Sequence, residues 1–137
     1  MLKVRDVMSV NVETLNPDDD LDLASMLMRL DRLHHLPVVE GDQLLGIISD
    51  RDVLSAQRSR FLETNKDESR RFNMGIKAKE AMTSQVDTIS PEASAVEAAQ
   101  MLREKGYGCL PVVDDGRVVG IVTPTDFLGL VVELLLA

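Results

Sequence analysis

Apolar residues occur in short blocks along the chain, and their spacing alternates between that of strands and that of helices. Four runs rich in β-branched residues predict two β-hairpins, because a short turn containing Gly and Asp separates the members of each pair. The runs are residues 36–39 with 44–48, and 110–113 with 118–122. Ahead of each hairpin, polar and apolar residues alternate over 10–15 and 84–89, which predicts a short strand.

A helix is predicted between each opening strand and its hairpin. Pro17 and Pro91 interrupt the chain just before these helices, and Asp20 and Ser94 are suited to cap them. In the second segment Gly106 is well placed to end the helix. A further apolar helix follows each hairpin and is predicted to begin near residues 52 and 126.

The whole pattern occurs twice. Residues 6–56 align with 80–130 at a constant offset of 74 and without gaps, so that Met8 matches Met82 and Pro17 matches Pro91. Each copy therefore predicts a β-α-β-β-α unit. One unit of about 50 residues is marginal for independent stability, which favours two units that share a core.

Composition and charge narrow the choice of function. Hydrophobic residues make up 45% of the chain but aromatic ones only 3%, so the core is expected to be aliphatic. A net charge of −8 argues against sequence-independent nucleic-acid binding. The single cysteine excludes an internal disulfide framework. The longest apolar stretch, 127–137, contains Glu133 and is too short to span a bilayer, and no secretion signal opens the chain, so we expect a cytoplasmic protein.

Residues 57–79 separate the repeats and are rich in charge. We interpret them as a charged, partly helical linker, which Asn73 and Gly75 end, between a first repeat at 1–56 and a second at 80–137. The linker is either a spacer or, through its basic residues, a contact for an anionic ligand or partner. Those residues are Arg58, Arg60, Lys66, Arg70, Arg71, Lys77 and Lys79.

Four duplicated motifs carry a resemblance to a known family. They are Asp-Val-Met-Ser at 6–9 with Ala-Met-Thr at 81–83, Thr-x-x-Pro at 14–17 and 88–91, Leu-Pro-Val-Val at 36–39 and 110–113, and Gly-Ile-(Ile/Val)-(Ser/Thr)-x-x-Asp at 46–52 and 120–126. Together they resemble a tandem pair of cystathionine-β-synthase (CBS) domains, a Bateman module. The layout is similar to the CBS portion of acetoin-utilisation-type proteins. The resemblance implies an α+β fold, with two β-α-β-β-α repeats packed about a pseudo-two-fold axis. It also implies binding of AMP, ADP, ATP or S-adenosylmethionine in clefts between the repeats.

The last motif contains the residues best suited to bind such a ligand. Asp52 and Asp126 can accept hydrogen bonds from both ribose hydroxyls, although a helix cap is the alternative role. Hydroxyl and cationic side chains beside them can contact ribose or phosphate, and an apolar strand residue can flank adenine or belong to the core. These residues are Ser49, Arg51, Thr123 and Thr125, with Ile47 and Ile121 as the apolar pair. Gly46 and Gly120 permit close backbone approach, or simply relieve crowding in the strand.

His34 and His35 are the only histidines. Their place before Leu36 resembles phosphate-contacting positions in the AMP-activated protein kinase gamma subunit and its relatives. Plain surface or core roles are the first alternative. Metal binding is weaker, because adjacent residues of an extended segment point to opposite faces and no partner stands at ligand spacing.

The resemblance further implies that each cleft draws residues from both repeats. One cleft would combine Val10, Val12, His34 and His35 with Ile121, Thr123, Thr125 and Asp126. The other would combine Ser84, Val86, Gly108 and Cys109 with Ile47, Ser49, Arg51 and Asp52. We predict that the first is the primary nucleotide site, because it has the better phosphate ligands. The negative net charge favours AMP, ADP or a cationic adenosine compound over ATP.

No nucleophile–base pair or phosphate-cradling Gly-x-x-x-x-Gly-Lys loop is present, so we expect no enzymatic activity. The rival hypothesis is a scaffold that has lost its ligand and acts through protein contacts. Residues 127–136 carry more apolar side chains than one buried face requires, which favours a homodimer over burial within the monomer. With no effector domain attached, regulation is expected to act in trans on an unknown protein.

Overall fold

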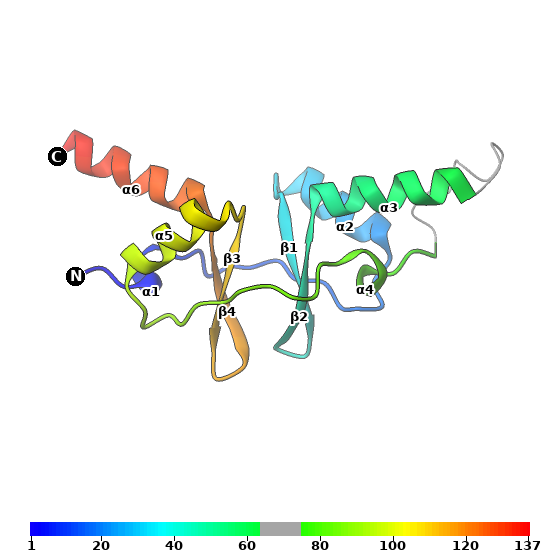
Figure 1. Cartoon of the computed structure of the whole chain (residues 1–137), viewed down its shortest axis with the longest axis horizontal. Coiled ribbons are helices and arrows are strands. Elements are labelled where there is room, and N and C mark those ends of the chain that lie inside the picture. Colours follow the sequence, from blue (N-terminus) through cyan, green and yellow to red (C-terminus); the bar gives the residue numbers. More distant parts are fainter. Residues whose placement is uncertain (64–74) are drawn as a thin grey trace. The chain divides into compact units, whose positions relative to one another are not determined.

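The computed structural model describes residues 1–63 and 75–137, which form two compact units (Figure 1). Unit 1 contains Met1–Val12 and Asp87–Ala137, and unit 2 contains Glu13–Val86. The repeat boundaries predicted from the sequence therefore differ from the boundaries of the compact units. Each unit contains the hairpin of one repeat together with the opening residues of the other.

Unit 1 is built on one antiparallel hairpin. Strands β3 (Leu110–Asp114) and β4 (Arg117–Val122) pair with Leu110 opposite Val122, and the helices α5 (Ala95–Lys105) and α6 (Pro124–Leu136) flank the end opposite the turn (Figure 1). The short helix α1 (Val4–Val7) completes the unit. Its core is aliphatic, and consists of Val4, Ile89, Ala98, Leu102, Leu110, Val112 and Val122.

Unit 2 has the same design. Strands β1 (His35–Glu40) and β2 (Gln43–Ser49) pair antiparallel, and the helices are α2 (Leu21–Leu30), α3 (Asp50–Glu63) and the short α4 (Ala78–Ala81). Its core contains Leu15, Leu21, Ala24, Leu36, Val38, Ile48, Val53, Ile76 and Ala78. The predicted α+β class, both hairpins and the aliphatic core are confirmed.

Local capping explains where the helices begin and end. The side chains of Asp20 and Ser94 accept hydrogen bonds from the Asp22 and Val96 amides, so both predicted N-caps are confirmed. Gly106 adopts the left-handed conformation at φ 67° and ends α5, as predicted.

The opening segments form less regular structure than their alternating pattern predicts. Each makes isolated bridges near its two ends in place of a continuous strand. Leu15 exchanges backbone hydrogen bonds with Pro37 and Val39 of β1 in unit 2, while Ser9, earlier in the same segment, pairs with Ile121 of β4 in unit 1. Because its ends pair with different hairpins, the segment has no single partner strand along its length.

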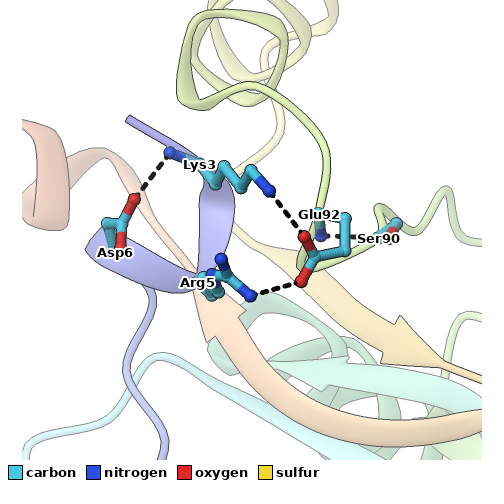
Figure 2. A network of polar contacts seen from close by, with 5 residues as sticks. All are labelled: Lys3, Arg5, Asp6, Ser90 and Glu92. Carbon is cyan, nitrogen blue, oxygen red and sulfur yellow. Dashed lines mark hydrogen bonds and ion pairs between the residues drawn. The ribbon is translucent and has the colours of Figure 1, made fainter. Parts of the chain in front are cut away.

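Charged side chains hold the start of the chain on unit 1. Figure 2 shows Lys3 and Arg5 converging on Glu92, at 2.8 Å and 2.7 Å from its two carboxylate oxygens. The hydrogen bond from Lys3 is the main reason why the pKa of Glu92 is lowered. Such exposed ion pairs contribute little stability individually, but they restrict where α1 lies.

The same arrangement occurs in unit 2 at the equivalent positions of the repeat. Lys77 and Lys79 lie 3.4 Å and 3.2 Å from a carboxylate oxygen of Asp18. These two linker residues therefore pair with an acidic side chain of their own unit. The other predicted basic residues that lie at 66–71, and Asn73, are outside the described residues.

Helix α3 begins two residues before the predicted start and continues into the predicted linker as far as Glu63. Gly75, which was predicted to interrupt the linker, has a positive φ of 82°. Within the two described stretches of the chain, no helix is long and apolar enough to cross a membrane.

Candidate ligand-binding site

A reciprocal capping arrangement opens α6. Thr123 is the N-cap and Pro124 occupies the first helical position, where its fixed φ is favourable and its missing amide costs nothing. The Thr123 amide donates to Oδ2 of Asp126 at 2.8 Å. Asp126 is therefore the third residue of a capping box, and this use occupies only one of its carboxylate oxygens.

The second carboxylate oxygen of Asp126 faces the N-terminal segment of the first repeat. The Ser9 hydroxyl donates to Oδ1 at 3.2 Å, and the Ser9 backbone exchanges two hydrogen bonds with Ile121. Gly120 makes this approach possible, because a Cβ there would lie 2.9 Å from the Ser9 carbonyl oxygen and 2.6 Å from the Met8 sulfur. The close-approach role predicted for Gly120 thus has a geometric basis in unit 1.

Unit 2 repeats this geometry. Ser49 and Asp52 form the capping box, with the Ser49 amide 2.9 Å from Asp52 Oδ2 and the Asp52 amide 3.1 Å from the Ser49 hydroxyl. The Thr83 hydroxyl lies 3.4 Å from both carboxylate oxygens, and the Thr83 backbone pairs with Ile47. At Gly46 a Cβ would lie only 2.6 Å from the Thr83 carbonyl oxygen.

Each site therefore presents a carboxylate and a hydroxyl beside the N-terminus of a helix. A carboxylate can accept hydrogen bonds from two neighbouring hydroxyls of a ligand, since its two oxygens offer several lone pairs. The helix N-terminus favours negative charge nearby, such as that of a phosphate. The arrangement is thus suited to a ligand that carries both a diol and an anionic group.

The predicted site residues divide between the two units. Unit 1 contains Val10, Val12, Ile121, Thr123, Thr125 and Asp126, with Gly108 and Cys109. Unit 2 contains Ile47, Ser49, Arg51, Asp52, Ser84 and Val86, with His34 and His35. The early residues of each repeat thus share a unit with the aspartate of the other repeat.

The histidines lie in unit 2, in the same unit as Asp52. His34 Nδ1 is 3.1 Å from Asp50 Oδ2, and both side chains are largely exposed. Burial lowers the pKa of His35, opposed in part by Asp50 and Asp52, so the neutral imidazole is favoured at neutral pH. The predicted pairing of the two histidines with Thr123 and Asp126 stays a prediction. Among residues 1–63 and 75–137, no group of three or more His, Cys, Asp or Glu side chains is positioned to hold a metal ion.

Cys109 is buried, and burial raises the pKa of its thiol to about 12, with a smaller contribution from the negative charge of Asp126. The side chain is therefore a neutral thiol at physiological pH, which suits packing rather than nucleophilic attack.

Ser9 and Thr83 are the site residues that sequence reasoning missed. Both end the short motif at the opening of a repeat, and they occupy equivalent positions at the offset of 74. A hydroxyl preserved at one position of both copies was the available indication. Its partner, however, lies 117 residues away for Ser9.

Comparison with known proteins identifies the repeats. The family model described as "CBS domain" matches the chain twice, over residues 4–59 and 78–133. A CBS domain-containing protein of Dictyostelium discoideum is 38% identical over 135 residues, which cover 96% of this chain and 92% of that protein. Other relatives are longer: the match covers 42% of an uncharacterized protein of Methanocaldococcus jannaschii, at 31% identity.

Three solved structures are similar over 98% of this chain. A putative acetoin utilization protein (AcuB) of Vibrio cholerae has a TM-score of 0.85 at 34% identity, with 93% of that chain covered. CBSX2 in complex with AMP has a TM-score of 0.82 at 26% identity. The CBS domain pair of protein MJ0100, in complex with 5′-methylthioadenosine and S-adenosyl-L-methionine, has a TM-score of 0.78 at 28% identity. For each of the last two, 98% of the other chain is covered.

Proposed function

The chain belongs to the CBS domain family, and from that premise we propose that it is a regulatory module that binds an adenosine-containing small molecule. AMP, ADP, ATP and S-adenosylmethionine are the candidate ligands. Support comes from the similar structures of CBSX2, described with AMP, and of the MJ0100 pair, described with two adenosine compounds.

The observation that carries this proposal is the carboxylate–hydroxyl pair at the start of α6 and of α3. Asp126 with Ser9, and Asp52 with Thr83, place a carboxylate acceptor and a hydroxyl donor beside a helix N-terminus in each unit. A ribose diol can replace the Ser or Thr hydroxyl as the donor to the carboxylate oxygen that does not accept from the capping amide. A phosphate group of the same ligand is then stabilised by the positive end of the nearby helix dipole.

Occupancy of the two sites is expected to differ, because the repeats are not identical around the aspartates. We assign the primary site to Asp126, as the sequence predicts. We assign Asp52, with Arg51, to the weaker site. Binding of a ligand would then alter how the module contacts an effector protein in trans, without catalysis by the module itself.

A homodimer is part of the same proposal. A scaffold that binds no ligand is the second candidate function, and one observation favours it: several large apolar side chains of α6 are exposed. Such side chains suit protein contacts whether or not a nucleotide binds.

Thermal unfolding of the purified protein with each candidate ligand tests the proposal. A ligand present at 100 times its dissociation constant adds about 2.7 kcal/mol to the free energy of unfolding, which raises Tm by several degrees. We expect a selective rise with at least one adenosine compound at about 1 mM. Asp126→Ala is expected to abolish most of it, and Asp52→Ala to have a smaller effect.

Because Asp126 also caps α6, its replacement lowers Tm without ligand. Ser94→Ala is the matched control, since it removes a helix cap at which no ligand is expected. This variant should lose baseline stability and keep the full ligand-induced rise. No rise with any adenosine compound would contradict the sensor and leave the scaffold as the better hypothesis.

A further inference from the structure

An apolar groove lies on the surface of unit 1. It has a volume of about 500 Å³ and is bordered by the N-terminal residues, α5 and the first part of α6 (Figure 1). Its walls include Leu2, Val96, Phe127 and Leu130. No lining residue belongs to either proposed adenosine site, and the volume is typical of a small-molecule site. The groove is therefore a second place at which unit 1 can bind a ligand.

The equivalent position in unit 2 is filled by that unit's own side chains. Both units have the same backbone hydrogen bond there, from the Ala95 amide to the Leu2 carbonyl and from the Leu21 amide to the Ile76 carbonyl, each at 2.9 Å. Leu21 and Ile76 are 0% and 6% exposed in the core of unit 2, whereas Leu2 is 45% exposed and Ala95 has only a methyl group. The groove thus arises from side-chain differences between the repeats and is not imposed by the fold.

Two polar side chains line the groove, and the other lining residues are all apolar. Gln100 and Arg103 lie three residues apart on α5, so they share one face of this helix. The Arg103 guanidinium lies 3.8 Å from a carboxylate oxygen of Glu104, and both side chains are largely exposed, so this ion pair contributes little. An arginine can bind a carboxylate through two parallel hydrogen bonds. Arg103 is therefore able to exchange Glu104 for the carboxylate of a ligand.

We propose that this groove binds an aliphatic carboxylate, a molecule with a hydrocarbon chain and one carboxylate group. The chain lies against the apolar walls, where it is removed from water, and the carboxylate pairs with Arg103. A cationic molecule of the same shape would place like charges together, so charge complementarity favours the anion. This site is independent of the proposed adenosine sites, and each can exist without the other.

Calorimetric titration of the full chain with decanoate, below its micelle concentration, tests the site. We expect one saturable binding event per chain. Octanoate should bind roughly five to ten times more weakly, because two fewer methylene groups leave water. Decyltrimethylammonium has the same hydrocarbon chain and the opposite charge, and should show no saturable binding.

Replacement of the cation tests the role of Arg103. Arg103→Gln should weaken decanoate binding about tenfold, since the charge-assisted pair is lost while the apolar walls remain. Arg29→Gln is the matched control. Arg29 is the equivalent residue of α2 at the offset of 74 and is exposed in unit 2, so its replacement should leave decanoate affinity unchanged.

Filling the groove is the second test. Ala99 lines the groove and is only partly buried, so Ala99→Leu places extra atoms in the space that the hydrocarbon chain would occupy. This variant should lose decanoate binding. Circular dichroism checks that it remains folded, and the Arg103→Gln result stands by itself if it does not.

Absence of decanoate binding would overturn the inference. So would equal losses in Arg103→Gln and Arg29→Gln, or equal binding of decyltrimethylammonium, which would indicate non-specific uptake of amphiphiles. Sedimentation velocity with and without decanoate identifies a protein occupant. A chain that binds decanoate only when diluted to the monomer has a second copy over the groove, and this result also overturns the inference. The adenosine-induced rise in Tm is expected to be the same in Arg103→Gln and wild type, so failure of either proposal leaves the other standing.

Discussion

Asp126 and Asp52 each serve two structural purposes at the scale of the single residue. One carboxylate oxygen satisfies the amide at the helix start, and the carboxylate also meets a hydroxyl from the opening of the other repeat. The helix-cap role and the ligand role, which the sequence presents as alternatives, are therefore compatible. A cap alone requires one acceptor, so a ligand hydroxyl can bind the second oxygen in place of the Ser9 or Thr83 hydroxyl.

Gly120 is predicted to be indispensable for the approach of the opening segment to β4. Gly120→Ala places a Cβ 2.9 Å from the Ser9 carbonyl oxygen, and this backbone atom is held by its hydrogen bond to Ile121. We expect the free energy of unfolding to fall by about 2 kcal/mol, measured by urea denaturation.

Gly129→Ala is the control for that variant. A Cβ at Gly129 meets nothing within 4 Å, and alanine favours the helix that contains it. We expect this variant to be neutral or more stable by up to about 1 kcal/mol. Equal losses in the two variants would show that crowding at Ser9 is not the cause.

The Cys109 thiol makes stability depend on pH in the alkaline range. Its pKa is raised from an ordinary value of 9.0 to about 12 in the folded chain, so above pH 9 the unfolded chain loses this proton first. The unfolded state then binds fewer protons than the native state, and stability falls as pH rises from about 9 toward 12. Chemical denaturation at several pH values measures the decline.

Cys109→Ala isolates this contribution from lysine and tyrosine residues that titrate in the same range. The variant is expected to be less stable at pH 7, because a buried side chain is shortened, but to show a shallower decline above pH 9. Identical slopes in the two proteins would contradict the assignment of the decline to Cys109.

At the scale of the element, the two helices that precede the hairpins end in the same backbone conformation with different residues. Gly106 has φ 67°, and Arg32, at the equivalent position of the first repeat, has φ 54°. A residue with a Cβ is strained in this left-handed region, whereas glycine is not. The first repeat therefore contains backbone strain that the second avoids.

Alanine at these two positions should have unequal effects. Gly106→Ala introduces the backbone strain and should lower the free energy of unfolding by about 1 kcal/mol. This loss is expected although the added Cβ would meet no atom within 4 Å. Arg32→Ala keeps a Cβ that is already present and should change stability by less than about 0.5 kcal/mol. Thermal unfolding of both variants measures the difference, and equal losses would show that φ is not the cause.

At the scale of the whole molecule, the compact units do not coincide with the repeats. Val4 is fully buried in the core that surrounds Val112 and Val122, and its amide donates to the Ala93 carbonyl at 2.8 Å. The start of the first repeat is thus an integral part of unit 1. A chain cut between its repeats loses core residues on one side of the cut.

A fragment of residues 80–137 should therefore fail to unfold cooperatively. It lacks α1 with Val4, and about 50–60 residues are marginal for folding even with a complete core. Addition of a peptide of residues 1–12 should restore a cooperative transition, observed by circular dichroism during heating. Cooperative unfolding of the fragment alone would contradict this role of the N-terminal segment.

The sequence by itself determined the repeat, the α+β class, both hairpins and the caps at Asp20, Ser94 and Gly106. These features depend on residues a few positions apart, such as turn glycines and side chains that reach the next amides, so their pattern is visible locally. The motif ending in Asp52 and Asp126 was identified in the same way, as a duplicated run of neighbouring residues.

Only the tertiary structure decided which partners these aspartates have and how the opening segments are used. Ser9 and Asp126 lie 117 residues apart, and no local pattern records such a contact. The alternation at 10–15 predicted a strand, but a strand needs one continuous partner, and the segment instead pairs near its two ends with different hairpins. The division of the chain into units that exchange their opening residues follows from those long-range hydrogen bonds, which the sequence pattern does not specify.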